Sequence, residues 1–537
     1  METIPYRFLR IVPLAVLSVL WLAVSAGPAA ADTPSYGGDV QVAQTLGDRE
    51  LTLVLRRVTT TPGPLRLDVI THAGSAAGSL RVALTPTGAA PEAPTVPAGV
   101  PTSRGAVTLG AVPGSYGTTL WVDRPGPWEL AVDDGQRTAR VPFVVLAQAT
   151  AAPERTVYGG FLVAGALLVV SLLVAVRTRR GAWALVPAGG VVAALSTSIT
   201  AAMLSASLPL PPQPGVRLDP TVHNAANPYA PAQPLVGDYS RPPVLLSVPG
   251  PAPVAGRAAD LTLDLTDGAT GLPVDDLVVH DGALVHLLMV GPSGQLWHAH
   301  PVRIAPGVFQ LHVTPPRTGH YALSVELVRR GGGVQVVRSP AGIDVITGVA
   351  AGPTPAPPPL APGYDATAIL SGTPVTVRAA VAVAGSPTTL TARIGDTNDL
   401  QPWLGMLGHL VVVGPLPDPP GADVGAAAQR VPVWAHAHSM GDLTPALFGT
   451  HDTNGRHDTD DAGSSPMDGM DGMAGLMPGN GDSAADETVA AYGPGISFTY
   501  TFPQPGHYRV WIQAERQYRI LTMPADLTIA PGTAGRR

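Results

Sequence analysis

Histidine is the residue type of this chain best suited to metal chemistry, and its distribution is uneven. Thirteen of the 14 histidines follow residue 208, and only His72 precedes it. Two later segments each carry a His-x-His pair, formed by His298 with His300 and by His436 with His438. Because alternate residues of a β-strand share one face, each pair can direct two imidazoles towards one metal ion.

The first pair belongs to a predicted hairpin. Two apolar runs flank the segment Gly-Pro-Ser-Gly at 291–294, which suits a three-residue turn whose last residue is left-handed. Such a turn places His286 opposite His300, with His298 as the diagonal neighbour. A two-residue turn would instead direct His286 to the opposite face of the hairpin. With the three-residue turn, His286, His298 and His300 form a trio able to bind copper or zinc.

The second pair has its own trio of His409, His436 and His438. The loop between its two strands is longer, so only the shared face of His436 and His438 follows from the sequence. For both trios the alternative is a polar strand face without metal, which two related repeats share by descent. We interpret His320 and His507 as structural, because a proline occupies the matching position of an earlier segment.

A methionine-rich insert over residues 439–487 is the most specific chemical signal. It is rich in Gly, Asp, Ser, Met and His, a composition typical of disorder without a ligand. Four methionines fall within 11 residues: Met467, Met470, Met473 and Met477. Methionine usually fills cores, whereas thioethers in a polar segment are soft ligands that favour Cu(I). The alternative is a low-complexity repeat of Met-Asp-Gly without a metal.

The composition excludes several other kinds of site. The 537 residues include no Cys and no Lys, so thiolate metal centres, cysteine nucleophiles and lysine Schiff bases are absent. A net charge of -7 disfavours a nucleic-acid partner. No phosphate-binding loop, His-Glu-x-x-His helix or Gly-x-Ser-x-Gly elbow is present, and we predict that the protein is not an enzyme.

The elements that position these residues are predicted to be β-strands. Short β-rich runs alternate with turns rich in Gly and Pro, which number 61 and 59. We predict a mainly β chain with three immunoglobulin-like β-sandwich domains, over residues 36–148, 241–347 and 364–529. Pro-rich linkers are predicted over 209–235 and 352–362.

The second and third sandwiches are predicted to be internal repeats. His286-Leu287 matches His409-Leu410 at an offset of 123, and Gly319-His320-Tyr321 matches Gly506-His507-Tyr508. The first sandwich shares only the latter feature, as Pro-Gly-Pro-Trp at 125–128. It is therefore predicted to be a relative without the histidines.

Targeting and membrane segments precede the histidines. Residues 1–31 are typical of a signal peptide cleaved after Ala31, with an uncleaved anchor as the alternative. The apolar runs 157–176 and 182–208 predict a two-helix transmembrane hairpin. Arginines at 177, 179 and 180 place the connecting loop in the cytoplasm. Both large soluble regions are then extracytoplasmic, and the protein is integral to the cell membrane.

The pattern of Gly-His-Leu-Val-Val-Val at 408–413, a His-x-His strand and Phe-Pro-Gln-Pro-Gly-His-Tyr-Arg-Val at 502–510 resembles a known family. It is similar to YtkA-like bacterial secreted immunoglobulin-like β-domains, which often occur near copper-handling proteins. The resemblance covers about two thirds of the chain and implies the fold more than an activity. Copper-carrying CopC-like relatives use a histidine at the mature N-terminus, whereas this chain has Asp32-Thr33-Pro34 there.

Together these patterns predict a membrane-anchored, extracytoplasmic copper-binding protein in copper handling or resistance. Its partners would be the membrane, the metal ion and copper transport proteins. One alternative is a structural or interaction protein of the envelope whose histidines bind no metal. The other is a copper-dependent redox enzyme.

Overall fold

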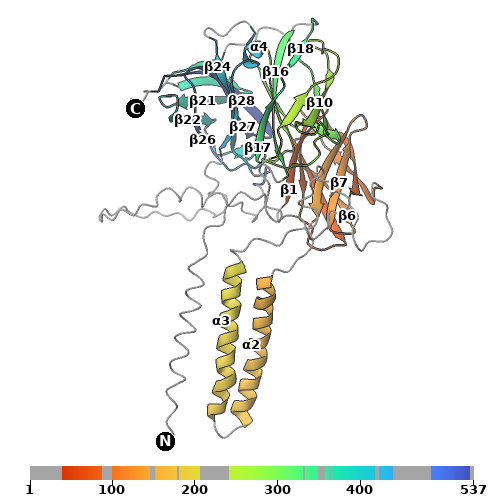
Figure 1. Cartoon of the computed structure of the whole chain (residues 1–537), viewed down its shortest axis with the longest axis vertical. Helices are drawn as coiled ribbons and strands as arrows, with labels where there is room; N and C mark the ends of the chain where they lie inside the picture. The colour runs from red at the N-terminus through yellow and green to blue at the C-terminus, as the bar shows by residue number, and fades with distance from the viewer. Residues whose placement is uncertain are drawn as a thin grey trace, which may run out of the picture. The chain divides into compact units, whose positions relative to one another are not determined.

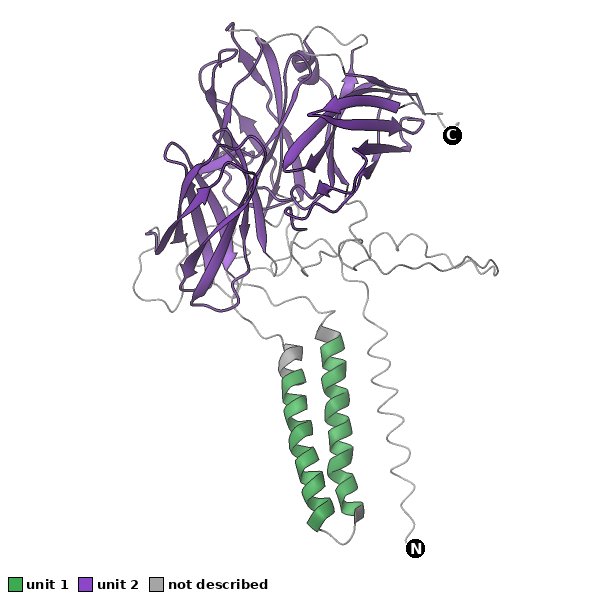
Figure 2. Cartoon of the chain, turned by 180° about the vertical axis from the view of Figure 1, so that it is seen from behind, with its two compact units in different colours: residues 1–34, 148–213 green, residues 35–147, 214–537 purple. Residues whose placement is uncertain are grey.

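The computed structural model describes residues 39–87, 100–145, 152–177, 181–205, 241–330, 333–348, 357–361, 365–417, 423–439 and 485–532. Over these residues the chain is mainly β, as predicted, and its strands form six sheets (Figure 1). The chain divides into two compact units (Figure 2). Residues 1–34 and 148–213 make the unit with two long helices, and residues 35–147 and 214–537 make the unit with the sheets.

The first two sheets enclose one core. Their strand orders are β1–β2–β3–β6 and β5–β4–β7–β8. The strands are β1 (Val40–Leu46), β2 (Arg49–Leu55), β3 (Gly63–Thr71), β4 (Gly78–Pro86), β5 (Ser103–Leu109), β6 (Gly114–Val122), β7 (Gly126–Asp133) and β8 (Thr138–Val145). Buried and less buried residues alternate along β7 and β8, as expected for strands with one face on a core. Leu53, Leu67 and Leu130 are fully buried between the two sheets.

The second pair of sheets has the orders β14–β15–β10–β9 and β11–β16–β12–β13, with β17 and β18 also paired to β16. Its strands are β9 (Val244–Ser247), β10 (Ala259–Asp267), β11 (Leu277–Val278), β12 (His286–Val290), β13 (Leu296–Ala299), β14 (Val302–Ala305), β15 (Val308–Val313), β16 (Gly319–Arg329), β17 (Val334–Arg338) and β18 (Ile343–Val345). Leu263, Leu287 and Val325 are fully buried in its core.

The third pair of sheets has the orders β20–β21–β22–β26 and β19–β28–β27–β24–β25, with β23 paired to β27. Its elements are β19 (Pro359–Leu360), β20 (Asp365–Leu370), β21 (Thr373–Ala379), β22 (Pro387–Ile394), β23 (Leu400–Gln401), β24 (Gly408–Leu416), α4 (Val424–Ala428), β25 (Val433–Ser439), β26 (Gly495–Thr501), β27 (Gly506–Arg516) and β28 (Arg519–Ile529). Leu390, Leu410 and Tyr508 are fully buried in its core.

All three sheet pairs share a corner in which an aromatic side chain is tied to the backbone. Each aromatic donates a hydrogen bond to the carbonyl oxygen four residues earlier, and each follows a glycine with positive φ by two positions. The three bonds are Trp128 Nε1 to Arg124 O (3.1 Å), Tyr321 Oη to Arg317 O (2.9 Å) and Tyr508 Oη to Gln504 O (3.0 Å). The match between the first segment and the later two is therefore visible in the structure at this corner.

The second and third sheet pairs pack together through β12 and β24. All five residues of β12 are buried, as are eight of the nine residues of β24, because each strand is covered on both faces. Leu288 and Val290 meet Val411, Val413 and other residues in a shared apolar cluster, while the alternate residues of both strands face their own cores. This double coverage explains the continuous apolar runs that follow His286 and His409 in the sequence.

The first sheet pair joins the other two beside the predicted histidine ligands. The amide of Thr45 in β1 donates to the carbonyl oxygen of His300 at 2.8 Å, and the amide of Ala43 donates to that of Gly282 at 2.7 Å. Ala43 is fully buried against Trp403 and Leu404. The first sheet pair thus covers one side of the region in which the histidines lie.

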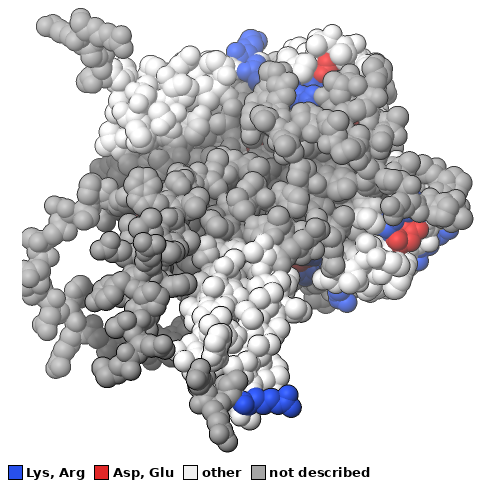
Figure 3. Space-filling view, turned by 60° about the horizontal axis from the view of Figure 1, so that its bottom comes forward, with Lys and Arg blue, Asp and Glu red and all other residues white. Residues whose placement is uncertain are grey.

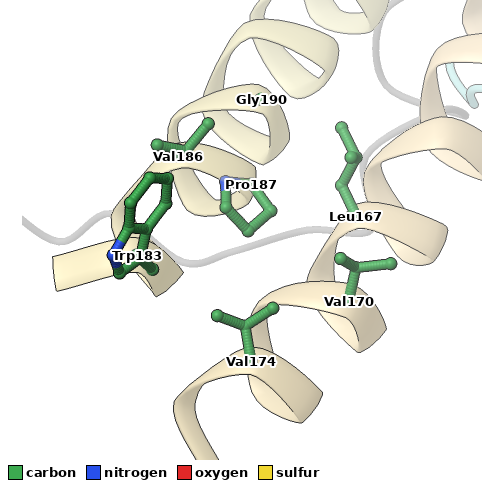
Figure 4. Close-up of a pocket in the computed structure, with 7 residues that line it drawn as sticks. All are labelled: Leu167, Val170, Val174, Trp183, Val186, Pro187 and Gly190. Carbon is green, nitrogen blue, oxygen red and sulfur yellow. The ribbon is translucent and has the colours of Figure 1, made fainter. Parts of the chain in front are cut away.

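The helical unit contains α2 (Ala152–Arg177), η2 (Gly181–Ala184) and α3 (Leu185–Ser205). The spans Thr156–Arg177 and Ala182–Met203 are long and apolar enough to cross a membrane. Helix packing is close at Gly160, where a Cβ would lie 2.0 Å from the hydroxyl oxygen of Ser198. Near η2 an open groove is lined by apolar side chains (Figure 4): Leu167, Val170, Val174, Trp183, Val186, Pro187 and Gly190.

Candidate metal centre

The six histidines that the sequence singles out lie in one cluster where the second and third sheet pairs meet. His286 and His298 come from β12 and β13, with His300 one residue beyond β13, and the other three come from β24 and β25. Neighbouring ring centroids are 4.4–5.6 Å apart, and the contacts cross the junction, as between His298 and His436 at 4.7 Å. Two predicted trios are therefore one cluster.

Strand register accounts for the arrangement. The amide of Gly291 donates to Gln295 O at 3.0 Å, and Leu287 pairs with Ala299, so the predicted three-residue turn is confirmed. Gly294 has a φ of 73°, the left-handed conformation that this turn requires. In the third sheet pair His409 pairs directly with His438, although the connection between their strands contains α4.

The hydrogen bonds of His286 and His298 determine which ring nitrogens carry lone pairs. His286 Nε2 lies 3.0 Å from the carbonyl oxygen of His280, which can only accept, so Nε2 is the donor and Nδ1 is unprotonated. His298 Nδ1 donates in the same way to Gln513 Oε1 at 2.9 Å. The unprotonated atoms, His286 Nδ1 and His298 Nε2, face each other at 3.3 Å. No proton is left to join them.

The third sheet pair repeats this geometry. His409 Nε2 donates to the carbonyl oxygen of Trp403 at 3.2 Å, again six residues earlier in the chain. Its Nδ1 therefore presents a lone pair 3.2 Å from His436 Nε2. His436 Nδ1 is buried without a hydrogen-bond partner, 3.6 Å from Glu326 Oε2, so the proton of this ring can lie on Nε2 and be donated to His409 Nδ1.

A metal ion fits between such nitrogen pairs. Tetrahedral coordination with metal–nitrogen distances of about 2.0–2.1 Å separates two ligand nitrogens by about 3.3 Å. The two observed separations of 3.3 and 3.2 Å agree with this value. Two facing lone pairs repel each other unless a cation or a proton lies between them, so the donor set suits a metal ion.

His300 and His438 complete the cluster in different ways. His409, His436 and His438 offer three nitrogens within 4.8 Å of one another, whereas on the other side His286 and His298 reach this spacing with His436 and not with His300. His300 Nδ1 instead donates to Glu50 Oε1 at 2.6 Å. The Nε2 atoms of His300 and His438 are both buried without a hydrogen-bond partner, which leaves them available to a metal.

Burial keeps four imidazoles of the cluster neutral. Burial, followed by repulsion from the charge that His300 would carry, lowers the pKa of His286 to about 3. The same two causes, burial first and neighbouring histidines second, hold the pKa values of His298, His409 and His436 well below the usual range. At neutral pH these four rings are thus uncharged nitrogen donors, the form that binds metals.

Carboxylates lie on one side of the cluster. Burial raises the pKa of Glu326 to about 7. Burial alone would raise the pKa of Asp281, but a hydrogen bond from His280 and the attraction of His438 lower it to about 2. Asp281 Oδ2 lies 3.0 Å from His280 Nε2 and 3.3 Å from His438 Nδ1.

No protein-family model and no curated protein sequence matches the chain. Among solved structures, a membrane-anchored protein from Corynebacterium diphtheriae aligns with 90% of this chain and 91% of its own, at 8% identity and a TM-score of 0.14. The FN1–FN3 domains of chicken CNTN1 align with 89% of this chain and 97% of their own, at 8% identity and a TM-score of 0.13. Because these TM-scores are low, strand pairing and side-chain geometry alone define the fold and the site.

Charged residues are sparse in the chain as a whole. On the face shown in Figure 3, the charged side chains among the described residues are scattered spots and form no continuous field of either sign. This agrees with a charged content of 13%. Electrostatic attraction of a polyanion has no visible basis on this face.

Sequence reasoning missed a second buried group at the junction of the first and third sheet pairs. His72 Nδ1 lies 2.6 Å from Glu515 Oε1, and His72 Nε2 lies 3.9 Å from Glu487 Oε2. Burial opposes protonation of His72, but the hydrogen bond and charge of Glu515 and the charge of Glu487 raise its pKa to about 9. Burial raises the pKa of Glu487 to about 8.

The sequence also missed the partners that orient the ligands. Glu326 and Gln513 are equivalent in the repeat, because each lies seven residues after the matching glycine, Gly319 or Gly506. In the strand register, each lies opposite the first histidine of its own trio. A polar residue seven positions after that glycine, with an apolar residue directly on each side, was the available signal. Nothing in the sequence linked Glu50 of the first sheet pair to His300.

The methionine run cannot be placed. Met467, Met470, Met473 and Met477 fall within 440–484, outside the described residues. The residues on either side are placed: Leu407 N donates to Ser439 O at 3.0 Å, and Leu404 N donates to Glu487 Oε1 at 2.6 Å. The chain therefore leaves and rejoins the described structure beside the loop that precedes His409.

The remaining histidines interpreted as structural lie outside the cluster. His320 Nδ1 lies 2.8 Å from Asp344 Oδ1 across the β16–β18 pair. His507 Nδ1 lies 3.1 Å from the hydroxyl of Thr528 on β28. Neither ring takes part in the ring contacts or nitrogen groups of the six histidines.

Proposed function

We propose that this protein is a membrane-anchored, extracytoplasmic copper-binding protein that acts in copper handling or resistance. The observation that carries the proposal is the pair of facing imidazole lone pairs of His286 and His298 at 3.3 Å, beside the equivalent nitrogens of His409 and His436 at 3.2 Å. Unprotonated nitrogens at this spacing inside a buried cluster need a cation to stabilise them. Histidine nitrogens alone suit copper or zinc, and copper(II) is the tighter binder of such sites.

The methionine run favours copper over zinc. Met467, Met470, Met473 and Met477 are soft ligands suited to Cu(I), and the chain that holds them is tethered beside the cluster at Ser439 and Glu487. We propose that the run captures Cu(I) and delivers it to the histidines. The proposal is for binding and transfer, not for catalysis.

The proposal also includes the architecture around the site. The three sheet pairs are three immunoglobulin-like domains, α2 and α3 cross the membrane as a hairpin, and residues 1–31 are a signal peptide. Arg177 and the two arginines that follow it support a cytoplasmic loop between the helices. The resemblance to YtkA-like and CopC-like secreted proteins supports an extracytoplasmic location for the three domains. Copper transport proteins of the same envelope are the proposed partners.

The decisive experiment is copper titration of the full chain in detergent. Cu(I) is added in competition with bathocuproine disulfonate, and bound metal is counted per chain. The variant His298→Leu with His436→Leu removes one nitrogen from each facing pair, and the variant His320→Gln with His507→Gln is the matched control. We expect wild type and control to compete for copper and the first variant to lose most of its affinity.

A second measurement keeps the test decisive if the leucine variant does not fold. X-ray absorption at the copper edge of the loaded wild-type chain should show several histidine nitrogens at about 2.0 Å. Absence of competition by the wild type, or copper bound without histidine nitrogens, would overturn the proposal. The envelope interaction protein without a metal role would then be the better account.

A further inference from the structure

The two halves of the histidine cluster share a backbone shape but differ in the loops beside it. Asp281 and Leu404 are equivalent in the repeat, and both have positive φ, 48° and 56°. Each is followed by a glycine with positive φ, and a Cβ on Gly282 would lie 2.9 Å from Leu404 Cβ, so the two loops touch. One loop carries His280 and Asp281 where the other carries Trp403 and Leu404.

The acidic loop and a neighbouring strand form a second potential ligand group. His280, Asp281 and Glu326 each offer one ligand atom, and the three atoms lie within 4.8 Å of one another. His280 Nε2 lies 3.0 Å from Asp281 Oδ2 and 3.8 Å from Glu326 Oε1. One nitrogen and two carboxylates suit a borderline divalent cation such as Cu(II) or Zn(II).

This group leads from solvent towards the buried histidines. The side chains of His280 and Asp281 are 31% and 28% exposed, that of His438 is 18% exposed, and that of His436 is 1% exposed. Asp281 Oδ2 lies 3.3 Å from His438 Nδ1, and Glu326 Oε2 lies 3.6 Å from His436 Nδ1. The buried Nδ1 of His436 has no hydrogen-bond partner and points towards this group.

The equivalent side of the other half is closed. Trp403 and Leu404 are buried with Ala43 and Met406 in an apolar cluster, and the first sheet pair covers them. Gln513 replaces Glu326 at the equivalent position. At the positions equivalent to Asp281 and Glu326, the third sheet pair therefore carries no carboxylate.

We propose that His280, Asp281 and Glu326 form an outer divalent-cation site that takes the ion from solvent and passes it to His436 and His438. This inference rests on the metal-binding function proposed above and adds a route by which a divalent ion reaches the centre, separate from the delivery of Cu(I) by the methionine run. The ion exchanges carboxylate oxygens for imidazole nitrogens one ligand at a time, with no change in its oxidation state.

Loading kinetics of the full chain in detergent test the route. Cu(II) is mixed with metal-free protein, tryptophan fluorescence is followed, and bound copper is counted at saturation. The variant His280→Gln with Asp281→Asn should load about tenfold more slowly, equivalent to about 1.4 kcal/mol in the barrier. It should also lose the weakest equivalent of copper at saturation. The matched control, His320→Gln with Asp344→Asn, alters an equally close His–Asp pair elsewhere and should load as the wild type does.

A second variant guards against misfolding. Glu326→Gln introduces the side chain that the other half has at this position, with nearly the same shape, and it should also slow loading. If the wild type takes up no copper, the proposed function fails. If the wild type takes up copper and both variants load at its rate, the outer site is refuted while the histidine centre stands.

Discussion

The halves of the cluster contributed by the second and third sheet pairs are alike in their ligands and different in their surroundings. In both, the first histidine donates to a carbonyl oxygen six residues earlier and presents Nδ1 to the second histidine, at 3.3 and 3.2 Å. Around this frame one half has acids and partial exposure, and the other has Trp403 and a cover from the first sheet pair. The two repeats thus share the geometry of the histidine ligands but differ in how far solvent reaches them.

The largest expected effect separates His436 from His298. His436 belongs to both nitrogen groups, with His286 and His298 and with His409 and His438, whereas His298 belongs to one. His436→Leu should weaken copper binding by more than about 100-fold, since even the outer partners of metal ligands are worth about 10–100-fold. His298→Leu should leave one nitrogen group intact and keep more affinity. Competition titration of both variants measures the difference, and equal losses would mean that the halves do not share His436.

Part of this site could be predicted from the sequence. A three-residue turn at 291–294 sets the side-chain parity of the hairpin, so His286 opposite His300 followed from local rules. The sequence does not predict that the two trios meet in one cluster, because this depends on how separate sheets pack. The apolar runs after His286 and His409 indicated strands covered on both faces, but apolar packing is not directional and names no partner.

The contacts of the first sheet pair with the site could not be predicted from the sequence. Glu50 reaches His300 from about 250 residues away, through contacts of β1 with the segment around His300. His72 and Glu515 are still further apart, at 443 residues. Such pairs have no local pattern, because each residue lies hundreds of positions from the group that it contacts.

The next effect compares the two outer partners of the last histidines. Glu50 holds His300 at 2.6 Å, and Asp281 holds His438 at 3.3 Å. Glu50→Gln should lower copper affinity by about 10–100-fold, because the amide no longer attracts the imidazole proton and the ring is less firmly oriented. Asp281→Asn should lower equilibrium affinity less, since its contact is longer. Isothermal titration of both variants makes the comparison, and a larger loss for Asp281→Asn would reverse it.

The next prediction concerns the pH dependence of stability, which we expect from the buried groups between the first and third sheet pairs and not from the metal centre. Glu487, whose pKa rises from 4.5 to about 8 on burial, keeps a proton that the unfolded chain loses in this range. The free energy of unfolding should therefore fall as pH rises from about 5 to 8. The pKa of His72 rises from 6.5 to about 9 on folding, so its stabilising contribution is lost as pH rises from about 6.5 to 9. Because one pKa unit is equivalent to about 1.4 kcal/mol, each shift corresponds to a few kcal/mol over its own pH interval.

Glu487→Gln tests this contribution, because the amide stays neutral at every pH. Thermal unfolding of the metal-free full chain in detergent, followed by near-ultraviolet circular dichroism, should show a flatter decline in stability between pH 5 and 8 than the wild type shows. The residual decline above pH 6.5 belongs to His72, and His72→Gln should remove it. A wild-type stability that rises over the same range would show that these groups are ionised differently.

The smallest expected effect concerns the histidines that the two halves share outside the cluster. His320 is paired with Asp344 at an exposed site, and His507 contacts a threonine hydroxyl, so each bond is worth about 0–1 kcal/mol. The first sheet pair has Pro127 at this position and keeps the same aromatic corner, which shows that the corner does not need an imidazole. His320→Gln and His507→Gln should therefore leave the number of bound copper ions unchanged. A loss of copper in either variant would mean that the repeat carries ligands at both ends of its strands, and that the six clustered histidines are only part of the metal-binding surface.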